Sequence, residues 1–147
     1  MSTRATEGFF LGDVKVQPPV VLAPMAGYTG PVFRLLCRGM GAGLVYTEML
    51  SSEALTREED YRRAQLRLMR GEGPTVVQLF GADPGRLAES ARMAEAIGAV
   101  AVDLNLGCPA PRVLRSGAGA ALAARPDLAR RCLAARAAPA PERRTLG

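Results

Sequence analysis

Short apolar runs alternate along the chain with longer stretches that are apolar on one side only. The runs consist mainly of Val, Leu and Ala, which is typical of strands that are buried on both faces of a parallel sheet. They predict strands over residues 20–23, 44–47, 74–79 and 100–104. Near the amino terminus, residues 9–17 form two apolar segments around Gly12-Asp13 and predict a hairpin.

The stretches between the runs have the spacing of helices. Pro31 stands where a first helical turn would begin, and the residues after it place Val32, Leu35, Leu36 and Met40 on one face. We expect that face to be buried. Residues 51–70 are charged and helical in part. Their inward positions are expected to be Leu55, Tyr61, Leu66 and Met69.

Two later segments carry clearer helix signals. Asp83 followed by Pro84 predicts an N-cap and a long helix that runs to about Ile97. Pro126 opens a last helix to Ala135. The glycines of Ser116 to Gly119 are interpreted as a turn, because no strand precedes them in the way that a phosphate-binding loop requires.

The predicted order is strand and helix in alternation, four times over. Alternation with short connections indicates an α/β fold with a parallel sheet and helical crossovers. Two architectures fit this pattern: an open doubly wound sheet, or part of an eight-unit barrel, which typically needs about 250 residues. The chain has 147 residues.

Chemistry in a parallel sheet gathers at the carboxyl ends of the strands. The segments there include the Pro24-Met25-Ala26-Gly27 loop, Gln78, and the Asn105 to Pro109 loop with Cys108. Small residues let a backbone approach a planar ligand, and amides can read an imide edge. Each residue also has a plainer interpretation: Gln78 as a backbone cap, Met25 as core filler, and Cys108 as an inert thiol.

Composition excludes several kinds of site. The sequence has no histidine, so a Ser/His/Asp or Cys/His catalytic pair is excluded, and we expect no metal site. Three separated cysteines indicate a reducing compartment, and the absence of an apolar leader or of a run of about 18 apolar residues predicts a cytoplasmic protein with no membrane contact. The net charge of +5 suits either a polyanion partner or a solvated surface.

Three segments resemble the tRNA-dihydrouridine synthase family. They are VVLAPMAGYTGPVFRLLCRGMGAGLVYTEMLSS, PTVVQLFGADPGRLAESA and VDLNLGCPAPRVLRSGAGAAL. The blocks APMAG, TEM, VQLFG and the NxGCP loop stand in that family's order and spacing, from about Phe10 to about Leu128. The resemblance implies a flavoprotein of the TIM-barrel type with FMN at the barrel mouth, NADPH as reductant and tRNA as substrate.

The resemblance also implies residue roles for reduction of the uracil alkene in tRNA uridines. Hydride from the flavin reaches one alkene carbon, and Cys108 donates a proton to the neighbouring carbon. Pro24, Met25 and Ala26 match the loop that packs on FMN, Gln78 matches a glutamine that hydrogen-bonds the flavin, and Asn105 matches an asparagine near flavin and substrate. A thiol suits the acid role because cysteine ordinarily has a pKa of about 8.5.

Basic side chains follow the cysteine loop. Arg112 and Arg115 are candidate tRNA phosphate contacts, or else a solvated face.

The chain departs from the family pattern after its fourth unit. We expect an incomplete TIM-type barrel of about the first four βα units: residues 1–8 as a tail, 9–136 as a partial FMN-binding domain, and 137–147 as a low-complexity tail. Open strand edges would invite self-association. Two alternatives remain: another FMN-barrel oxidoreductase of the dihydroorotate dehydrogenase kind, or an inactive fragment with residual RNA binding.

Overall fold

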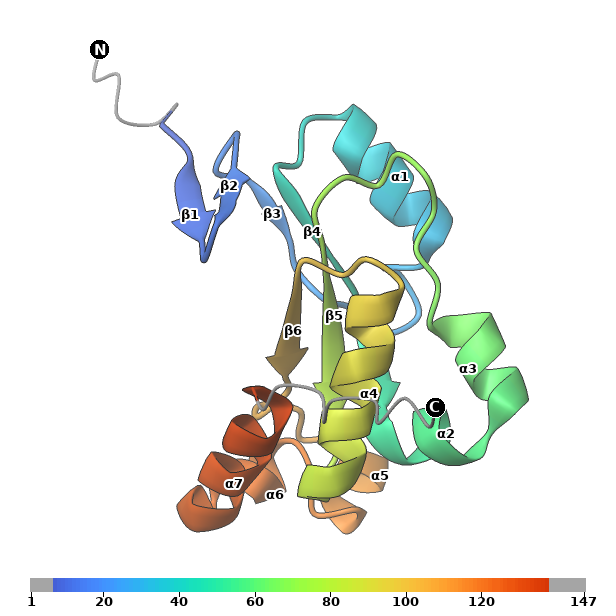
Figure 1. Ribbon diagram of the computed structural model, residues 1–147, viewed down its shortest axis with the longest axis vertical. Coiled ribbons are helices and arrows are strands. Elements are labelled where there is room, and N and C mark those ends of the chain that lie inside the picture. Colours follow the sequence, from blue (N-terminus) through green and yellow to red (C-terminus); the bar gives the residue numbers. More distant parts are fainter. Residues whose placement is uncertain (1–6, 138–147) are drawn as a thin grey trace, which may run out of the picture.

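A four-stranded parallel sheet forms the centre of the described residues, 7–137, in a computed structural model of the chain (Figure 1). Its strands lie in the order β3-β4-β5-β6, which is also their order along the chain. Their bounds are β3 Val21–Leu22, β4 Leu44–Ser51, β5 Thr75–Phe80 and β6 Ala101–Leu104. The predicted hairpin is confirmed as β1 (Phe9–Leu11) paired antiparallel with β2 (Val14–Val16).

One or more helices follow each strand of the sheet. They are α1 Pro31–Gly39, α2 Ser52–Arg57, α3 Glu59–Gln65, α4 Pro84–Ala96, α5 Pro111–Arg115, α6 Ala120–Ala123 and α7 Pro126–Ala137. The predicted start of α4 is confirmed, because the Asp83 carboxylate accepts a hydrogen bond from the Arg86 amide at 2.9 Å. The short helices α5 and α6 were not predicted, because the hydropathy pattern of the segment after β6 has no helical period.

The largest apolar cluster lies between the sheet and its helices. Val77, Leu79 and Leu104 from β5 and β6 pack there with Leu87 of α4. Residues of α6 and α7 extend the cluster with Leu122, Ala129 and Cys132. Burying such side chains is the main stabilising contribution in a domain of this size.

The opposite face of the sheet has a smaller cluster. Val16 of the hairpin packs there with Leu44 and Val76, beside Tyr46 and Ala101. Strands in consecutive order, with the crossovers of one hand that are general for parallel βαβ units, place the helices on one face, as in a barrel and unlike an open doubly wound sheet. The α/β prediction is confirmed, and the barrel type is favoured.

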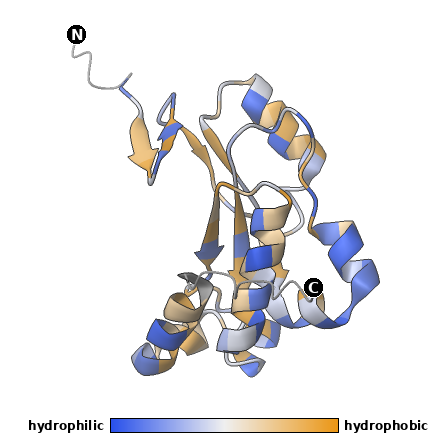
Figure 2. Ribbon diagram, viewed as in Figure 1, coloured by the Kyte–Doolittle hydropathy of each residue, from blue (hydrophilic) through white to orange (hydrophobic). Residues whose placement is uncertain are grey.

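The first strand and first helix correct two predictions. The strand expected over 20–23 is short and lies at the sheet edge, with Val20 56% exposed. On α1, the face expected to be buried is largely open: Val32 is 67%, Leu36 60% and Met40 88% exposed. Figure 2 shows apolar positions on α1 and the hairpin as well as on the central strands. A helix buries its apolar stripe only where a neighbouring element covers it.

Smaller differences concern the other elements. β4 continues to Ser51, beyond its predicted end at residue 47, and β5 extends one residue beyond its predicted end, to Phe80. Met69, expected inward, is exposed. Within residues 7–137, no helix is long and apolar enough to cross a bilayer. The tail expected to begin at residue 137 is wrong at its first residue, because Ala137 still belongs to α7; residues 138–147 and residues 1–6 of the tail expected over 1–8 lie outside the described residues.

Candidate active site

Polar side chains occupy the face of the sheet that carries the smaller apolar cluster, here called the inner face. They lie towards the carboxyl ends of the strands. Gln78 of β5 lies opposite Asp103 of β6 in the strand register. The Gln78 Nε2 group donates to Asp103 Oδ2 at 2.7 Å, and Asn105 Nδ2 donates to Gln78 Oε1 at 3.2 Å. The amide of Gln78 is therefore held at both ends, which fixes its orientation.

Asn105 connects this pair of amides to the cysteine loop. Its Oδ1 atom accepts hydrogen bonds from the backbone N–H groups of Gly107 at 3.2 Å and Cys108 at 2.9 Å. Its own N–H donates to the Leu79 carbonyl at 2.8 Å, which continues the β5–β6 pairing. Asparagine side chains stabilise turns in this way. The structure thus brings Gln78, Asn105 and Cys108 together as predicted.

The glycine-rich turn after α5, residues 116–119, also supports the cysteine loop. The Cys108 carbonyl accepts a hydrogen bond from the Ala120 N–H at 3.1 Å. Gly119 has a φ of +59°, and a Cβ atom there would lie 2.5 Å from the Cys108 carbonyl oxygen. The turn interpretation of this segment is therefore correct, but incomplete, because only glycine permits this close approach.

Cys108 differs from Cys132 in its surroundings. It is half-buried on the loop after β6 and belongs to neither apolar cluster. Cys132, by contrast, is fully buried in the main core, where burial raises the pKa of its thiol. The loop position leaves Cys108 at the sheet edge where ligands bind in folds of this kind.

The loop after β3 reaches the same edge. The Gly27 N–H donates to Glu48 Oε2 of β4 at 2.8 Å. The next residue of β4, Met49, places its sulfur 3.8 Å from Asn105 Nδ2. Met25 is 51% exposed and Ala26 is also exposed, whereas Pro24 is half-buried. Contacts through β4 thus connect the Pro24 to Gly27 loop with the amide and cysteine residues.

Charge affects one further group on the inner face. Burial raises the pKa of the Tyr46 phenol above 10.0, and the negative charge of Asp103 raises it further. Tyr46 is therefore a neutral hydroxyl at physiological pH. The Asp103 carboxylate therefore acts on two neighbours: it raises the pKa of Tyr46, and it accepts a hydrogen bond from Gln78.

An open cleft of about 810 Å³ lies beside these residues. It is lined by the ends of β4 and β5, by α2 and by α5, including Met49, Phe80 and Arg112. Arg112 and Arg115 are both exposed on α5, so they are available to a ligand that enters from this side. The predicted residues Gln78, Asn105 and Cys108 are not part of the cleft lining. Met49 connects the cleft with these residues, because it lines the cleft and also contacts Asn105.

Comparison with known proteins identifies the family. The family model described as dihydrouridine synthase (Dus) matches residues 21–141. The chain belongs to the dihydrouridine synthase family. The match includes every residue proposed above for the site, from Pro24 to Cys108.

Individual members of the dihydrouridine synthase family are similar over most of this chain. The tRNA-dihydrouridine synthase B of Yersinia pestis is 42% identical over 127 residues, 85% of this chain and 39% of that protein. The tRNA-dihydrouridine synthase B of Escherichia coli K12 is 40% identical over 123 residues, 84% of this chain and 38% of its own length. A probable tRNA-dihydrouridine synthase of Rhodobacter capsulatus is 44% identical over 127 residues, 85% and 39% respectively. The chain thus spans about two fifths of these relatives.

Sequence reasoning missed three residues that support the candidate site. Glu48 and Asp103 hold the Gly27 and Gln78 groups, and Gly119 supports Cys108. Asp103 had a detectable signal, since a lone carboxylate inside an otherwise apolar strand usually has a specific partner. Glu48 had none beyond its place after the predicted end of its strand, and Gly119 had none beyond its place in the glycine-rich turn.

Proposed function

We propose that this chain carries the first half of a tRNA-dihydrouridine synthase active site, on the first four βα units of a barrel. The complete enzyme would reduce the uracil alkene of tRNA uridines to dihydrouridine. Family membership supports the reaction class. The domain assignment, residues 9–136 as a partial FMN-binding barrel, is part of the same proposal.

The residues present fit FMN as the cofactor. Met25 offers an exposed apolar side chain, and a Cβ atom built at Gly27 would meet nothing within 4 Å, so the loop is open to a flat ring. Gln78 donates through one N–H to Asp103, which leaves its second N–H for a ligand carbonyl. We assign Pro24, Met25, Ala26, Gln78 and Asn105 to FMN binding. Bound FMN, reduced by NADPH, would supply the hydride.

The role of the protein's own residues is to orient the partners and to deliver a proton. Cys108 donates its thiol proton to the alkene carbon next to the one that accepts hydride, so the two additions saturate the double bond. Asn105 fixes the loop through its bonds to the Gly107 and Cys108 amides. A correctly placed general acid contributes about 10²–10⁴-fold to a rate.

One observation carries this proposal. Asn105 contacts the side-chain amide of Gln78 through its nitrogen and the backbone amide of Cys108 through its oxygen. One side chain thus fixes the position of the proposed flavin-binding amide relative to the proposed acid. A dihydroorotate dehydrogenase-like reaction would use the cysteine as a base instead. An inactive remnant with residual RNA binding would need neither contact.

The test uses a chimera, because the chain spans about two fifths of its relatives. Residues 1–128 replace the matching part of the Yersinia pestis relative, and dihydrouridine is measured in unmodified tRNA with FMN and NADPH. We expect activity in the chimera and a loss of about 10²-fold or more with Cys108→Ala. Cys37→Ala, a half-buried cysteine on α1, is the matched control and should retain activity. Orotate formation from dihydroorotate without dihydrouridine would contradict the proposal.

Partners and location follow from the same proposal. Exposed Arg112 and Arg115 would contact tRNA phosphates, which predicts salt-sensitive binding. The expected location is the cytoplasm. We also propose self-association of the isolated chain through the edge of β3 and the exposed face of α1, because an open strand edge pairs readily with another chain. Light scattering after gel filtration measures this, and a monomer at high concentration would contradict it.

A further inference from the structure

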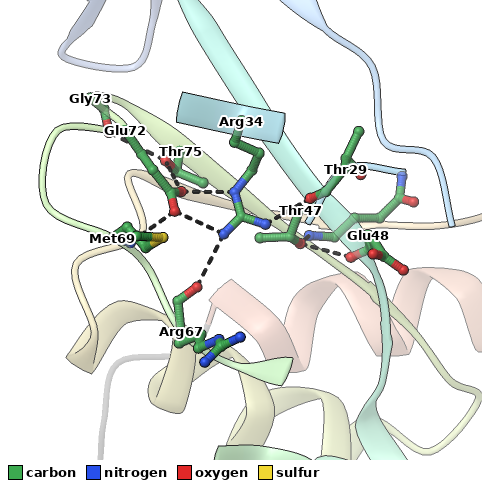
Figure 3. A network of polar contacts seen from close by, with 10 residues as sticks. Thr29, Arg34, Thr47, Glu48, Arg67, Met69, Glu72, Gly73 and Thr75 are labelled. Atoms are coloured by element: carbon green, nitrogen blue, oxygen red, sulfur yellow. Dashed lines mark hydrogen bonds and ion pairs between the residues drawn. The ribbon is translucent and has the colours of Figure 1, made fainter. Parts of the chain in front are cut away.

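A buried ion pair lies beneath the first helix. The Arg34 and Glu72 side chains are only 3% and 1% exposed, and the Arg34 Nε and Nη2 groups donate to the two Glu72 carboxylate oxygens at 2.7 and 3.0 Å (Figure 3). Moving two charges out of water costs several kcal/mol per ion in proteins, and a buried pair is often no more stabilising than apolar residues of equal volume. Stability alone is therefore a weak explanation for this pair.

Arg34 also makes a contact that an apolar residue could not make. Its Nη1 group donates to the Thr29 carbonyl oxygen at 2.7 Å, and Nη2 donates to the Arg67 carbonyl at 3.1 Å. Figure 3 shows the guanidinium between the Glu72 segment on one side and Thr29 on the other. A planar guanidinium with its five N–H donors is suited to such divided contacts, whereas a lysine ammonium is not.

Thr29 transmits this contact to the loop that carries Met25. Its side chain is fully buried, and its Oγ1 atom accepts from the Met25 N–H at 3.1 Å. The Met25 carbonyl accepts from both the Thr29 N–H at 3.0 Å and the Thr29 hydroxyl at 3.1 Å. The Met25 backbone is thus fixed by Thr29, and Thr29 is fixed by Arg34.

Glu72 fixes the other end of the arrangement. It lies in the segment before β5, where its Oε1 atom accepts from the Met69 N–H at 2.8 Å. Its Oε2 atom also accepts from the Thr75 hydroxyl at 3.4 Å, at the first residue of β5. The chain of contacts therefore runs from the amino end of β5 to the loop after β3.

We propose that Arg34, held by Glu72, is a positioning residue that sets the Met25 loop in the conformation that receives the flavin. This inference rests on the proposed function for the ligand, but the ordering of the loop can be measured without it. The pair would then serve the geometry of the site and not chiefly the stability of the fold.

The test compares two lysine variants of the full chain. Arg34→Lys keeps a positive charge beside Glu72 but cannot also reach the Thr29 carbonyl. Arg38→Lys is the control one turn later on α1, where the Arg38 guanidinium donates to the Ala42 carbonyl. Amide hydrogen exchange under native conditions is measured at Met25 and Val77, and FMN affinity is measured by quenching of flavin fluorescence in the chain and in the chimera.

The proposal expects exchange at Met25 to become about ten-fold faster in Arg34→Lys, the effect of losing one hydrogen bond to a charged group, with Val77 unchanged. FMN should bind about ten-fold more weakly. Arg38→Lys should change neither quantity. If Arg34→Lys does not fold, Thr29→Val, which keeps the ion pair and the side-chain shape, should weaken FMN binding in the same way.

Unchanged exchange at Met25 in folded Arg34→Lys would overturn the positioning role. Faster exchange with unchanged FMN affinity would overturn the connection to the flavin. Absence of FMN binding by the unmutated chain and chimera alike would contradict the proposed function instead, and the exchange result would then decide the role of Arg34 in ordering the loop.

Discussion

Two sides of the molecule, one around β5, β6 and α4 and the other around β3 and α1, differ in what they bury. Around β5, β6 and α4, apolar side chains such as Val77, Leu79 and Leu87 are fully enclosed. On β3 and α1, most of the large apolar side chains are exposed, and the buried side chain of α1 is Arg34, which pairs with Glu72. The first side is an ordinary core, whereas the second combines a polar clamp with an uncovered apolar surface. The proposals above account for this difference: the ion pair orders the Met25 loop, and the uncovered apolar surface is where we expect self-association.

The largest expected effect concerns the ion pair. Arg34→Ala leaves the Glu72 carboxylate buried without its partner, which should lower the free energy of unfolding by about 3–5 kcal/mol. Glu59 and Arg63 form an exposed pair on α3, and Arg63→Ala should cost no more than about 0.5 kcal/mol. Urea denaturation of both variants measures the difference. Equal losses would contradict the burial of the Arg34–Glu72 pair.

Truncating leucines compares the two sides directly. Leu87→Ala removes a fully enclosed side chain of α4 and should cost about 2–5 kcal/mol. Leu36→Ala removes a side chain that is 60% exposed on α1 and should change stability by less than about 0.5 kcal/mol. Thermal and urea unfolding at low protein concentration give both values. A large loss in Leu36→Ala would show that α1 is covered in the isolated chain.

Glycine substitutions test the support of the cysteine loop. Gly119→Ala combines a positive φ with a clash against the Cys108 carbonyl and should cost about 2–3 kcal/mol. Gly98 also has a positive φ, but a Cβ there meets nothing within 4 Å, so Gly98→Ala should cost only about 1 kcal/mol. Denaturation midpoints give the comparison. The reverse order would contradict close packing at Cys108.

The smallest expected effect is the pH dependence from Tyr46. Because its pKa is raised in the folded state, the unfolded phenol ionises first, and stability should fall as the pH rises from 10.0 towards the folded pKa. In Tyr46→Phe this part of the fall should be absent. Unfolding free energies between about pH 8 and about pH 11 test the sign. An identical slope in both proteins would exclude the burial of this phenol.

Prediction from sequence succeeded around β5, β6 and α4 and failed around α1. The strands, the Asp83 cap and the shared placement of Gln78, Asn105 and Cys108 were predictable, because hydropathy period and strand ends report local and sheet-level rules. The burial of α1 was predicted wrongly, because periodicity identifies an apolar stripe but not what covers it. Arg34 and Glu72, 38 residues apart, were invisible for the same reason: their pairing is purely tertiary.

In the proposed reaction, Cys108 supplies the proton that completes alkene saturation. The most direct measurement separates the two halves of the reaction in the chimera. Flavin is first reduced by NADPH, and its reoxidation by unmodified tRNA is then followed by absorbance. The account predicts that Cys108→Ala is reduced by NADPH at the rate of the unmutated protein but is reoxidised by tRNA about 10²-fold more slowly or not at all. Reoxidation by tRNA at the unmutated rate, with dihydrouridine formed, would contradict it.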